Sequence, residues 1–314
     1  MATYTLLTQN DVQKIADNYN LTVIKFAPIV GGNGNSSYKL TTQNGKYVLT
    51  VCDDKTLDEV TVMGKLLLLL QHHDFPCTRI ISSVNNELTT LYKDKPVMLK
   101  GYIEGEVFEN LDANMLVQLG TEMARLNQIP APNYLPTEHP YGCSYFPQVF
   151  GLNIDAKYES WLKEQFAGLA RDISSELPLA LIHGDLFYDN LLFEKRTFNA
   201  IIDFEEACFY YRVFELGMAI IGSCVEDNLV DLEKACALVQ GYQQIKPLEK
   251  IEQESLQMFV QYAATATSYW RFDKYNIDAP EKNKANKHWE MVELSESVKA
   301  ISPSKFIDAI FASK

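Results

Sequence analysis

The chain has 314 residues, 47% of them apolar, so it can bury the core of one large domain or two smaller ones. Its 41 acidic and 28 basic side chains give a net charge of −13. This charge argues against non-specific binding to nucleic acid or to an anionic membrane, because both need a basic surface. It is compatible with a cationic or zwitterionic small substrate, although many acidic cytosolic enzymes have none.

The six cysteines predict a chain without disulfides. No two form a Cys-x-x-Cys pair, and no cluster of Cys and His has the spacing of a zinc site. The N-terminus lacks the basic and apolar regions of a signal peptide. The longest apolar run, residues 66–70, is far shorter than the ~20 residues that span a bilayer. We therefore expect a cytoplasmic protein.

The first third of the chain has the patterns of a small antiparallel sheet with two helices. Helical spacing of apolar residues predicts helices at 8–19 and 56–72, and Thr56 with Glu59 has the sequence of a capping box. Asn44-Gly45 and Asn85-Asn86 predict the turns of two hairpins. Short runs bounded by turn residues predict strands at 21–26, 38–42, 46–51, 80–84, 88–92 and 96–103.

The remainder is mainly helical. A loop rich in Pro and Tyr runs through residues 130–147. Apolar periodicity predicts helices at 111–127, 155–173, 213–224, 229–243, 251–272 and 286–299. The change in pattern predicts a hinge near residues 100–105. We therefore expect an α+β fold with an N-terminal domain at 1–100 and a C-terminal domain at 101–314.

The most informative segment is a His-x-Asp pair followed by an Asn and a further Asp. These residues are His183, Asp185, Asn190 and Asp203. Transfer of phosphate from Mg·ATP to a hydroxyl needs a carboxylate that orients and deprotonates the acceptor, and oxygen ligands for the metal. Asp185 fits the first role. Asn190 and Asp203 fit the second, because two short strands within residues 191–202 should form a hairpin that brings them together.

Each of these residues alone is more simply interpreted as a turn former or a core histidine. The joint spacing favours the catalytic interpretation. A glycine-rich turn, Gly31-Gly-Asn-Gly-Asn-Ser36, lies upstream between two predicted strands. Its backbone N–H groups are suited to cover the phosphates of ATP.

Together these segments resemble the aminoglycoside phosphotransferase and choline kinase superfamily, over nearly the whole chain and in the expected order. The resemblance implies a two-lobed protein-kinase-like fold. A small antiparallel-sheet N-lobe would bind the nucleotide, and a larger, mainly helical C-lobe would carry catalysis and substrate binding. ATP and Mg²⁺ are the implied cofactors.

The resemblance also implies roles for individual residues. Asp185 and His183 would be catalytic, and Asn190 and Asp203 would bind Mg²⁺. Glu215, in the Glu-Leu-Gly that replaces the usual Asp-Leu-Ala, would be structural. The implied nucleotide-binding positions are Gly31, Gly32, Asn33, Gly34, Asn35, Ser36, Thr50, Glu59, Lys100, Tyr102 and Ile103.

Within that superfamily, residues 33–51, 95–105 and 263–272 resemble the homoserine kinases of this fold. The implied activity is ATP-dependent phosphorylation of the hydroxyl of L-homoserine, a step of threonine biosynthesis. Thr50 stands where kinases of this fold often carry a phosphate-binding Lys. The homoserine kinase-like group accepts Thr there, so this departure supports the subgroup. It also leaves Glu59 without its usual lysine partner, and Lys39 on the neighbouring strand is expected to point to solvent.

A zwitterionic acceptor needs carboxylates for its ammonium group and a cation, preferably Arg, for its carboxylate. Adjacency and charge suggest Asp189, Glu205, Glu206, Arg212 and Arg271 for these roles. Tyr269 and Trp270 are expected to pack in the core.

Two alternatives remain open. The acceptor could instead be choline, ethanolamine, an aminoglycoside or methylthioribose. Choline would call for an aromatic cage, and a large aminosugar for an extended acidic cleft. The other alternative is a non-catalytic nucleotide-binding regulator, suggested by Thr50. The intact Asp185, Asn190 and Asp203 argue against it.

Overall fold

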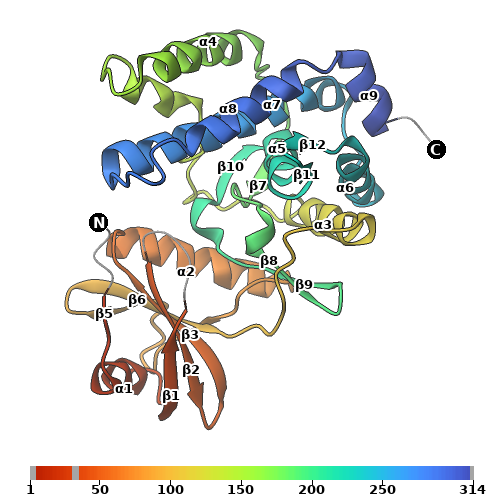
Figure 1. The fold of residues 1–314 in the computed structure, drawn as a ribbon. Coiled ribbons are helices and arrows are strands. Elements are labelled where there is room, and N and C mark those ends of the chain that lie inside the picture. Colours follow the sequence, from red (N-terminus) through yellow and green to blue (C-terminus); the bar gives the residue numbers. More distant parts are fainter. Residues whose placement is uncertain (1–4, 30–34, 312–314) are drawn as a thin grey trace. The chain divides into compact units, whose positions relative to one another are not determined.

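A computed structural model describes residues 5–29 and 35–311 of the chain (Figure 1). Residue contacts divide the chain into two units. The first comprises Met1–Gly105 and Asn199–Asp203, and the second comprises Glu106–Phe198 and Phe204–Lys314. An antiparallel sheet forms the centre of the first unit and helices dominate the second, which confirms the predicted α+β class.

The segment Asn199–Asp203 belongs to the first unit, although the sequence placed it in the C-terminal lobe. The Ile201 N–H donates to the Pro76 carbonyl at 2.9 Å. The Asn199 side-chain amide donates to the Glu104 carbonyl at 2.6 Å. A boundary drawn at one point of the sequence therefore cannot describe a unit that includes a segment from much later in the chain.

The sheet of the first unit is antiparallel throughout, in the order β1-β2-β3-β6-β4, and β5 also pairs with β6. Its strands are β1 (Val23–Pro28), β2 (Asn35–Thr42), β3 (Gly45–Cys52), β4 (Ile80–Ile81), β5 (Thr90–Tyr92) and β6 (Lys95–Gly101). The predicted hairpin of 80–84 with 88–92 is wrong. Both strands bond instead to β6, whose central residues are buried.

The two faces of this sheet differ. Helix α1 (Gln9–Asp17) packs on the face where Tyr38 lies opposite Leu49. The other face carries Ser37 opposite Thr50. Directly opposed residues of antiparallel strands point to the same face. Thr50 therefore lies on the face away from α1.

Both helices of the first unit begin at capping boxes. Thr8 and Asp11 form a capping box at the start of α1. Thr56 and Glu59 form another at the start of α2 (Leu57–His72), as the sequence predicted. The Glu59 carboxylate accepts the Thr56 N–H at 2.7 Å and is exposed.

Helices of the second unit are α3 (Ala113–Leu126), α4 (Ala156–Asp172), α5 (Arg212–Ser223), α6 (Leu232–Ile245), α7 (Lys250–Asp273), α8 (His288–Lys299) and α9 (Pro303–Phe311). The remaining short strands form the pairs β7 (Leu179–Ile182) with β10 (Cys208–Tyr211), β8 (Leu191–Glu194) with β9 (Thr197–Ile201), and β11 (Val225–Glu226) with β12 (Leu229–Val230). Residues 199–201 of β9 belong to the first unit. The pairing of β8 with β9 confirms the predicted hairpin. No pattern in the sequence predicted β7, β10, β11, β12 or α9.

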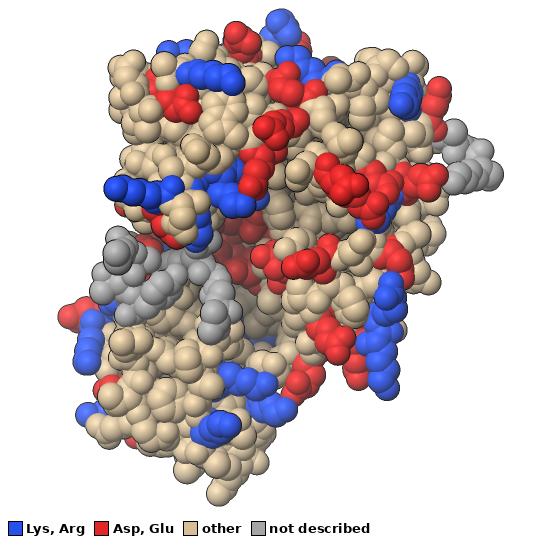
Figure 2. All heavy atoms as spheres, in the orientation of Figure 1, with Lys and Arg blue, Asp and Glu red and all other residues tan. Residues whose placement is uncertain are grey.

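Helix α5 is buried over all its residues, as expected of a helix that is apolar on every side. It contacts α7 and the paired strands β7 and β10. Over the residues that the structure describes, no helix combines the length and apolar character that a bilayer crossing requires. Asp and Glu side chains gather on the visible face of the second unit (Figure 2).

Helices α3 and α6 approach closely at two glycines. A Cβ added at Gly120 would lie 2.0 Å from the Leu238 carbonyl oxygen, and one at Gly241 would lie 2.1 Å from the Val117 carbonyl oxygen. Both distances are far below contact distance and involve backbone, so any side chain would force the helices apart.

We predict that Gly120→Ala lowers the free energy of unfolding by about 1–3 kcal/mol, because overpacking against backbone has to move α6. Gly168→Ala in α4 is the matched control, since its Cβ would meet no atom within 4 Å. That control should gain about 0.5–1 kcal/mol from helix propensity. Urea titration of both variants measures the difference, and equal or reversed effects would contradict the close approach.

Candidate active site

The candidate catalytic loop begins where β7 ends at Ile182. His183 is fully buried, and its Nδ1 accepts the Asp185 N–H at 3.2 Å. Its ring contacts Phe204 edge-on, with 4.6 Å between the centroids. His183 was predicted to be catalytic. In the structure it supports the backbone that carries Asp185.

Two buried side chains, Glu215 and His139, bond to the backbone around Gly184. The Glu215 carboxylate accepts the His183 N–H at 2.7 Å and the Gly184 N–H at 2.9 Å. The His139 Nε2 lies 2.9 Å from the Gly184 carbonyl oxygen. Gly184 has φ +86°, and a Cβ there would lie 2.6 Å from the Glu206 carbonyl oxygen. Only glycine fits this position without strain.

Burial changes the ionisation of both groups. It raises the pKa of Glu215 to about 7, although the two N–H donors favour the charged form. Burial lowers the pKa of His139 to about 4, so this imidazole is neutral at neutral pH. The loop is therefore held by a carboxyl group that titrates near neutrality and by an uncharged histidine.

Asp185 is half-buried, and both of its carboxylate oxygens accept hydrogen bonds. The Tyr141 hydroxyl donates to Oδ1 at 3.1 Å. The Asn190 Nδ2 donates to Oδ2 at 3.3 Å and to the Asp185 backbone carbonyl at 2.8 Å. No sequence pattern predicted a role for Tyr141, which lies in the loop at residues 130–147. The tyrosine-rich composition of this loop was the available signal, but it did not indicate Asp185 as a partner.

The predicted metal ligands offer oxygen atoms. Since the Nδ2 of Asn190 bonds to Asp185, the amide oxygen of Asn190 points away from that residue. Asp203 follows β9, is exposed and has φ +66°, a backbone conformation that Asp adopts more readily than most residues. Carboxylate and amide oxygens are the ligands that Mg²⁺ selects, so each of the two residues offers a suitable ligand atom. Asn190 belongs to the second unit and Asp203 to the first.

The predicted acidic substrate residues lie in short segments next to the loop. Asp189 is exposed in the 3-10 turn Tyr188–Asn190, while Glu205 and Glu206 are half-buried in the turn Phe204–Glu206. The charge of Glu206 helps to raise the pKa of Tyr141, after burial and Asp185. The charge of Glu206 therefore acts on Tyr141, the residue whose hydroxyl donates to Asp185.

The two predicted arginines have protein partners. Arg212 is buried and forms a bidentate ion pair with Glu252, which is fully buried. This pair is internal to the second unit, so we do not keep Arg212 as a substrate residue. Arg271 is partly exposed, and its Nη1 lies 3.0 Å from Glu290 Oε2 and 3.2 Å from the Lys287 carbonyl. It remains the candidate cation.

The predicted nucleotide residues at the start of the chain are only partly described, because Gly31, Gly32, Asn33 and Gly34 lie outside the described residues. Asn35 and Ser36 begin β2, and the buried Ser36 hydroxyl donates to Asp53 Oδ2 at 2.5 Å. Thr50 is buried, with its hydroxyl 3.3 Å from that of Ser37.

Lys100, Tyr102 and Ile103 are half-buried at and after the end of β6. The Tyr102 N–H donates to the Lys46 carbonyl at 3.1 Å. The expectation that Lys39 points to solvent is wrong: it is half-buried, and its ammonium group lies 3.6 Å from the Tyr102 ring centroid. A cation–π contact explains this placement, because the ring face attracts the ammonium group.

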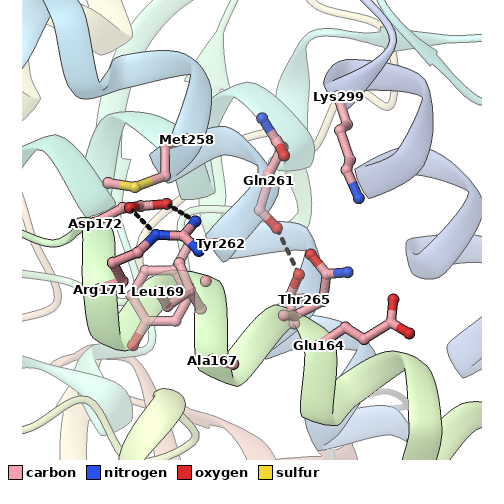
Figure 3. Close-up of a pocket in the computed structure, with 12 residues that line it drawn as sticks. Glu164, Ala167, Leu169, Arg171, Asp172, Met258, Gln261, Tyr262, Thr265 and Lys299 are labelled. Carbon is pink, nitrogen blue, oxygen red and sulfur yellow. Dashed lines mark hydrogen bonds and ion pairs between the residues drawn. The ribbon is translucent and has the colours of Figure 1, made fainter.

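A separate cavity of about 400 Å³ lies between α4, α7 and the end of α8 (Figure 3). Its walls include Glu164, Arg171, Gln261, Thr265 and Lys299. Arg171 bonds to its neighbour Asp172 there. No residue predicted from the sequence for catalysis, nucleotide, metal or substrate lines this cavity, so it does not belong to the candidate active site.

Glu215 and His139 should affect the pH dependence of stability in opposite directions. Between pH 4.5 and 7 the folded chain keeps the Glu215 proton that the unfolded chain loses, so this group lowers stability as pH rises. Between pH 6.5 and 4 the unfolded chain binds a proton that buried His139 does not, so this group lowers stability as pH falls. The two contributions offset each other.

We predict that single substitutions reveal how each group changes the free energy of unfolding with pH. Relative to wild type, Glu215→Gln should lose stability as pH falls from 7 to 4.5, and His139→Gln should gain stability as pH falls from 6.5 to 4. Each change should total at most about 3 kcal/mol. Urea unfolding at a series of pH values measures it, and Glu254→Gln, at an exposed glutamate, is the control. Variant curves that run parallel to wild type would contradict the assignment.

Comparison with known proteins places the chain in a family. The pattern of the phosphotransferase enzyme family matches residues 25–248. A homoserine kinase of Gluconobacter oxydans (strain 621H) is 27% identical over 280 residues, covering 84% of this chain and 87% of that protein.

Two solved structures share the fold. An amicoumacin kinase in complex with AMP-PNP and Ca²⁺ is 11% identical with a TM-score of 0.75, covering 96% of this chain and 97% of that one. A microcompartment-associated aminopropanol kinase is 16% identical with a TM-score of 0.72, covering 96% and 100%. Since the family pattern spans most of the chain and the kinase-like fold agrees with it, the protein belongs to the phosphotransferase enzyme family.

Proposed function

We propose that this phosphotransferase uses Mg·ATP to phosphorylate the hydroxyl of L-homoserine, a reaction of threonine biosynthesis. The observation that carries the transfer chemistry is the half-buried Asp185, whose two carboxylate oxygens are held by Tyr141 and Asn190. A fixed carboxylate on a rigid loop is what phosphoryl transfer needs from a protein, because catalysis depends mainly on positioning and electrostatics.

In this proposal Asp185 accepts the proton of the acceptor hydroxyl. The acceptor oxygen bonds to the γ-phosphorus, the bond from that phosphorus to the bridging oxygen breaks, and ADP leaves. Asn190 and Asp203 would hold Mg²⁺, which neutralises charge on the phosphates when bound. In the first unit, Lys100, Tyr102 and Ile103 would contact the adenine, and the residues at 31–36 would contact the phosphates.

Homoserine is supported by three observations. The homoserine kinase of Gluconobacter oxydans aligns with most of this chain. Glu206, and by adjacency Glu205 and Asp189, supply negative charge for an ammonium group. Arg271 is the remaining proposed cation for a carboxylate, and it would exchange its contact with Glu290 for the substrate.

One observation favours an amino alcohol without a carboxylate as the second candidate. Arg212 is committed to Glu252, and Arg271 already contacts Glu290 and the Lys287 carbonyl. The acidic groups would then recognise the ammonium, and no cation would be needed. A non-catalytic regulator remains the third candidate because of Thr50.

A matched pair of acceptors separates these candidates. Aminopropanol with a terminal amine and a terminal hydroxyl is homoserine without its carboxylate. We predict that wild type prefers L-homoserine about 10- to 100-fold in kcat/KM, the usual value of one charge-assisted pair. ADP release and phosphorus NMR of the product measure it. An equal or reversed preference would favour the amino alcohol, and no turnover across a wider panel of hydroxyl compounds would favour the regulator.

The two acceptors, L-homoserine and aminopropanol, also test the proposed role of Arg271. In Arg271→Ala the kcat/KM for homoserine should fall toward the kcat/KM for aminopropanol. The KM for ATP should stay at its wild-type value. Lys250→Ala is a suitable control, because this exposed cation at the start of α7 pairs only loosely with Glu254, at 3.5 Å. A homoserine preference that survives Arg271→Ala would remove this residue from the acceptor site.

A further inference from the structure

Tyr141 of the second unit places a buried hydroxyl at the loop that carries Asp185. Its side chain is 6% exposed, and its hydroxyl lies 3.1 Å from Asp185 Oδ1 and 3.4 Å from the Gly184 carbonyl oxygen. Two acceptors thus share one buried donor. Both belong to the loop that carries the proposed catalytic base, although 44 positions of sequence separate Tyr141 from Asp185.

The ring of Tyr141 is held independently of its hydroxyl. It packs edge-on against His139, with 4.2 Å between the centroids, and it lies 6.5 Å from the Trp270 ring. The structure leaves Trp270 half-exposed, where the sequence analysis expected it in the core. Since these contacts fix the ring, the direction of the hydroxyl is set before any ligand binds.

The hydroxyl stays protonated in this setting. Burial and the charge of Asp185 raise the pKa of Tyr141 well above its usual value, with a further contribution from Glu206. Tyr141 therefore acts as a donor toward the carboxylate. Asn190 reaches the other oxygen of the same carboxylate, at 3.3 Å. With one donor on each oxygen, the plane of the Asp185 carboxylate is fixed.

We propose that Tyr141 is a positioning residue for phosphoryl transfer, holding Asp185 Oδ1 so that the carboxylate faces the acceptor hydroxyl in one orientation. This inference rests on the proposed function, because it assigns Asp185 the role of base. It adds a residue from outside the His-x-Asp segment to the catalytic machinery. The residue acts on the carboxylate and not on the nucleotide.

The test is Tyr141→Phe, which removes the donor and keeps the ring contacts with His139 and Trp270. We expect kcat with the preferred acceptor to fall about tenfold, because a hydrogen bond to a charged group is lost. The KM for ATP should not change. The acid limb of the kcat profile should move to higher pH, because the charged carboxylate loses a donor that favours it.

Tyr210→Phe is the matched control. Tyr210 is buried in the same aromatic cluster, 6.2 Å from His139 between ring centroids, and its hydroxyl pairs with that of Tyr262 at 2.9 Å. Both variants lose one buried hydroxyl, so a general loss of packing would affect them equally. The control should keep the wild-type kcat and acid limb, and melting temperatures of both variants check that they are folded.

The outcomes separate the two claims. If wild type phosphorylates a hydroxyl compound and Tyr141→Phe matches it in kcat and in acid limb, the role of Tyr141 is wrong while the proposed function stands. If both variants lose activity to the same extent, Tyr141 has only a packing role. If wild type turns over no hydroxyl compound with ATP, the proposed function fails and this inference fails with it.

Discussion

The candidate site depends on a single residue, Gly184, whose backbone N–H bonds to Glu215 and whose carbonyl oxygen lies at His139. Glu215 accepts two backbone N–H groups of the loop, and His139 lies at the Gly184 carbonyl. Gly184 has a positive φ and no room for a Cβ, so only glycine fits at this turn without strain. This turn sets the backbone position of Asp185, and every proposed role of the Asp185 carboxylate depends on that position.

The supports of Gly184 come from elements that the second unit buries deeply. Glu215 lies on α5, which is buried over all its residues, and the Arg212–Glu252 ion pair links that helix to α7. A buried pair of this kind contributes little net stability, but removing one partner leaves a costly buried charge. Arg212 therefore belongs to the framework beneath the site, and the acceptor must find its cation elsewhere.

Local signals in the sequence predicted local structure well. The capping box of Thr56 and Glu59 starts α2 as expected, and the β8–β9 hairpin forms as the apolar strands and intervening turn indicated. These features depend on residues within a few positions of each other. The same locality explains why Glu59, named for a nucleotide role, is found at a helix cap.

Local patterns of this kind did not predict the long-range contacts. The segments 80–84 and 88–92 look like a hairpin, yet both strands pair with β6, whose central position is not visible in their own sequences. Tyr141 carries no motif, and only the fold brings it to Asp185. Arg212 had the right charge and the right neighbourhood in sequence, but its partner lies 40 residues later. The spacing of His183, Asp185 and Asn190 indicated the chemistry, and the fold supplied the supports around it.

The most direct measurement of the central claim is turnover by Asp185→Asn alongside its nucleotide affinity. The amide keeps the shape of the carboxylate and can still accept the Tyr141 hydrogen bond, but it cannot take a proton from an acceptor. The account predicts a fall in kcat of about 10²- to 10⁴-fold with ATP affinity nearly unchanged. A variant that keeps the wild-type kcat would contradict the assignment of Asp185 as the base.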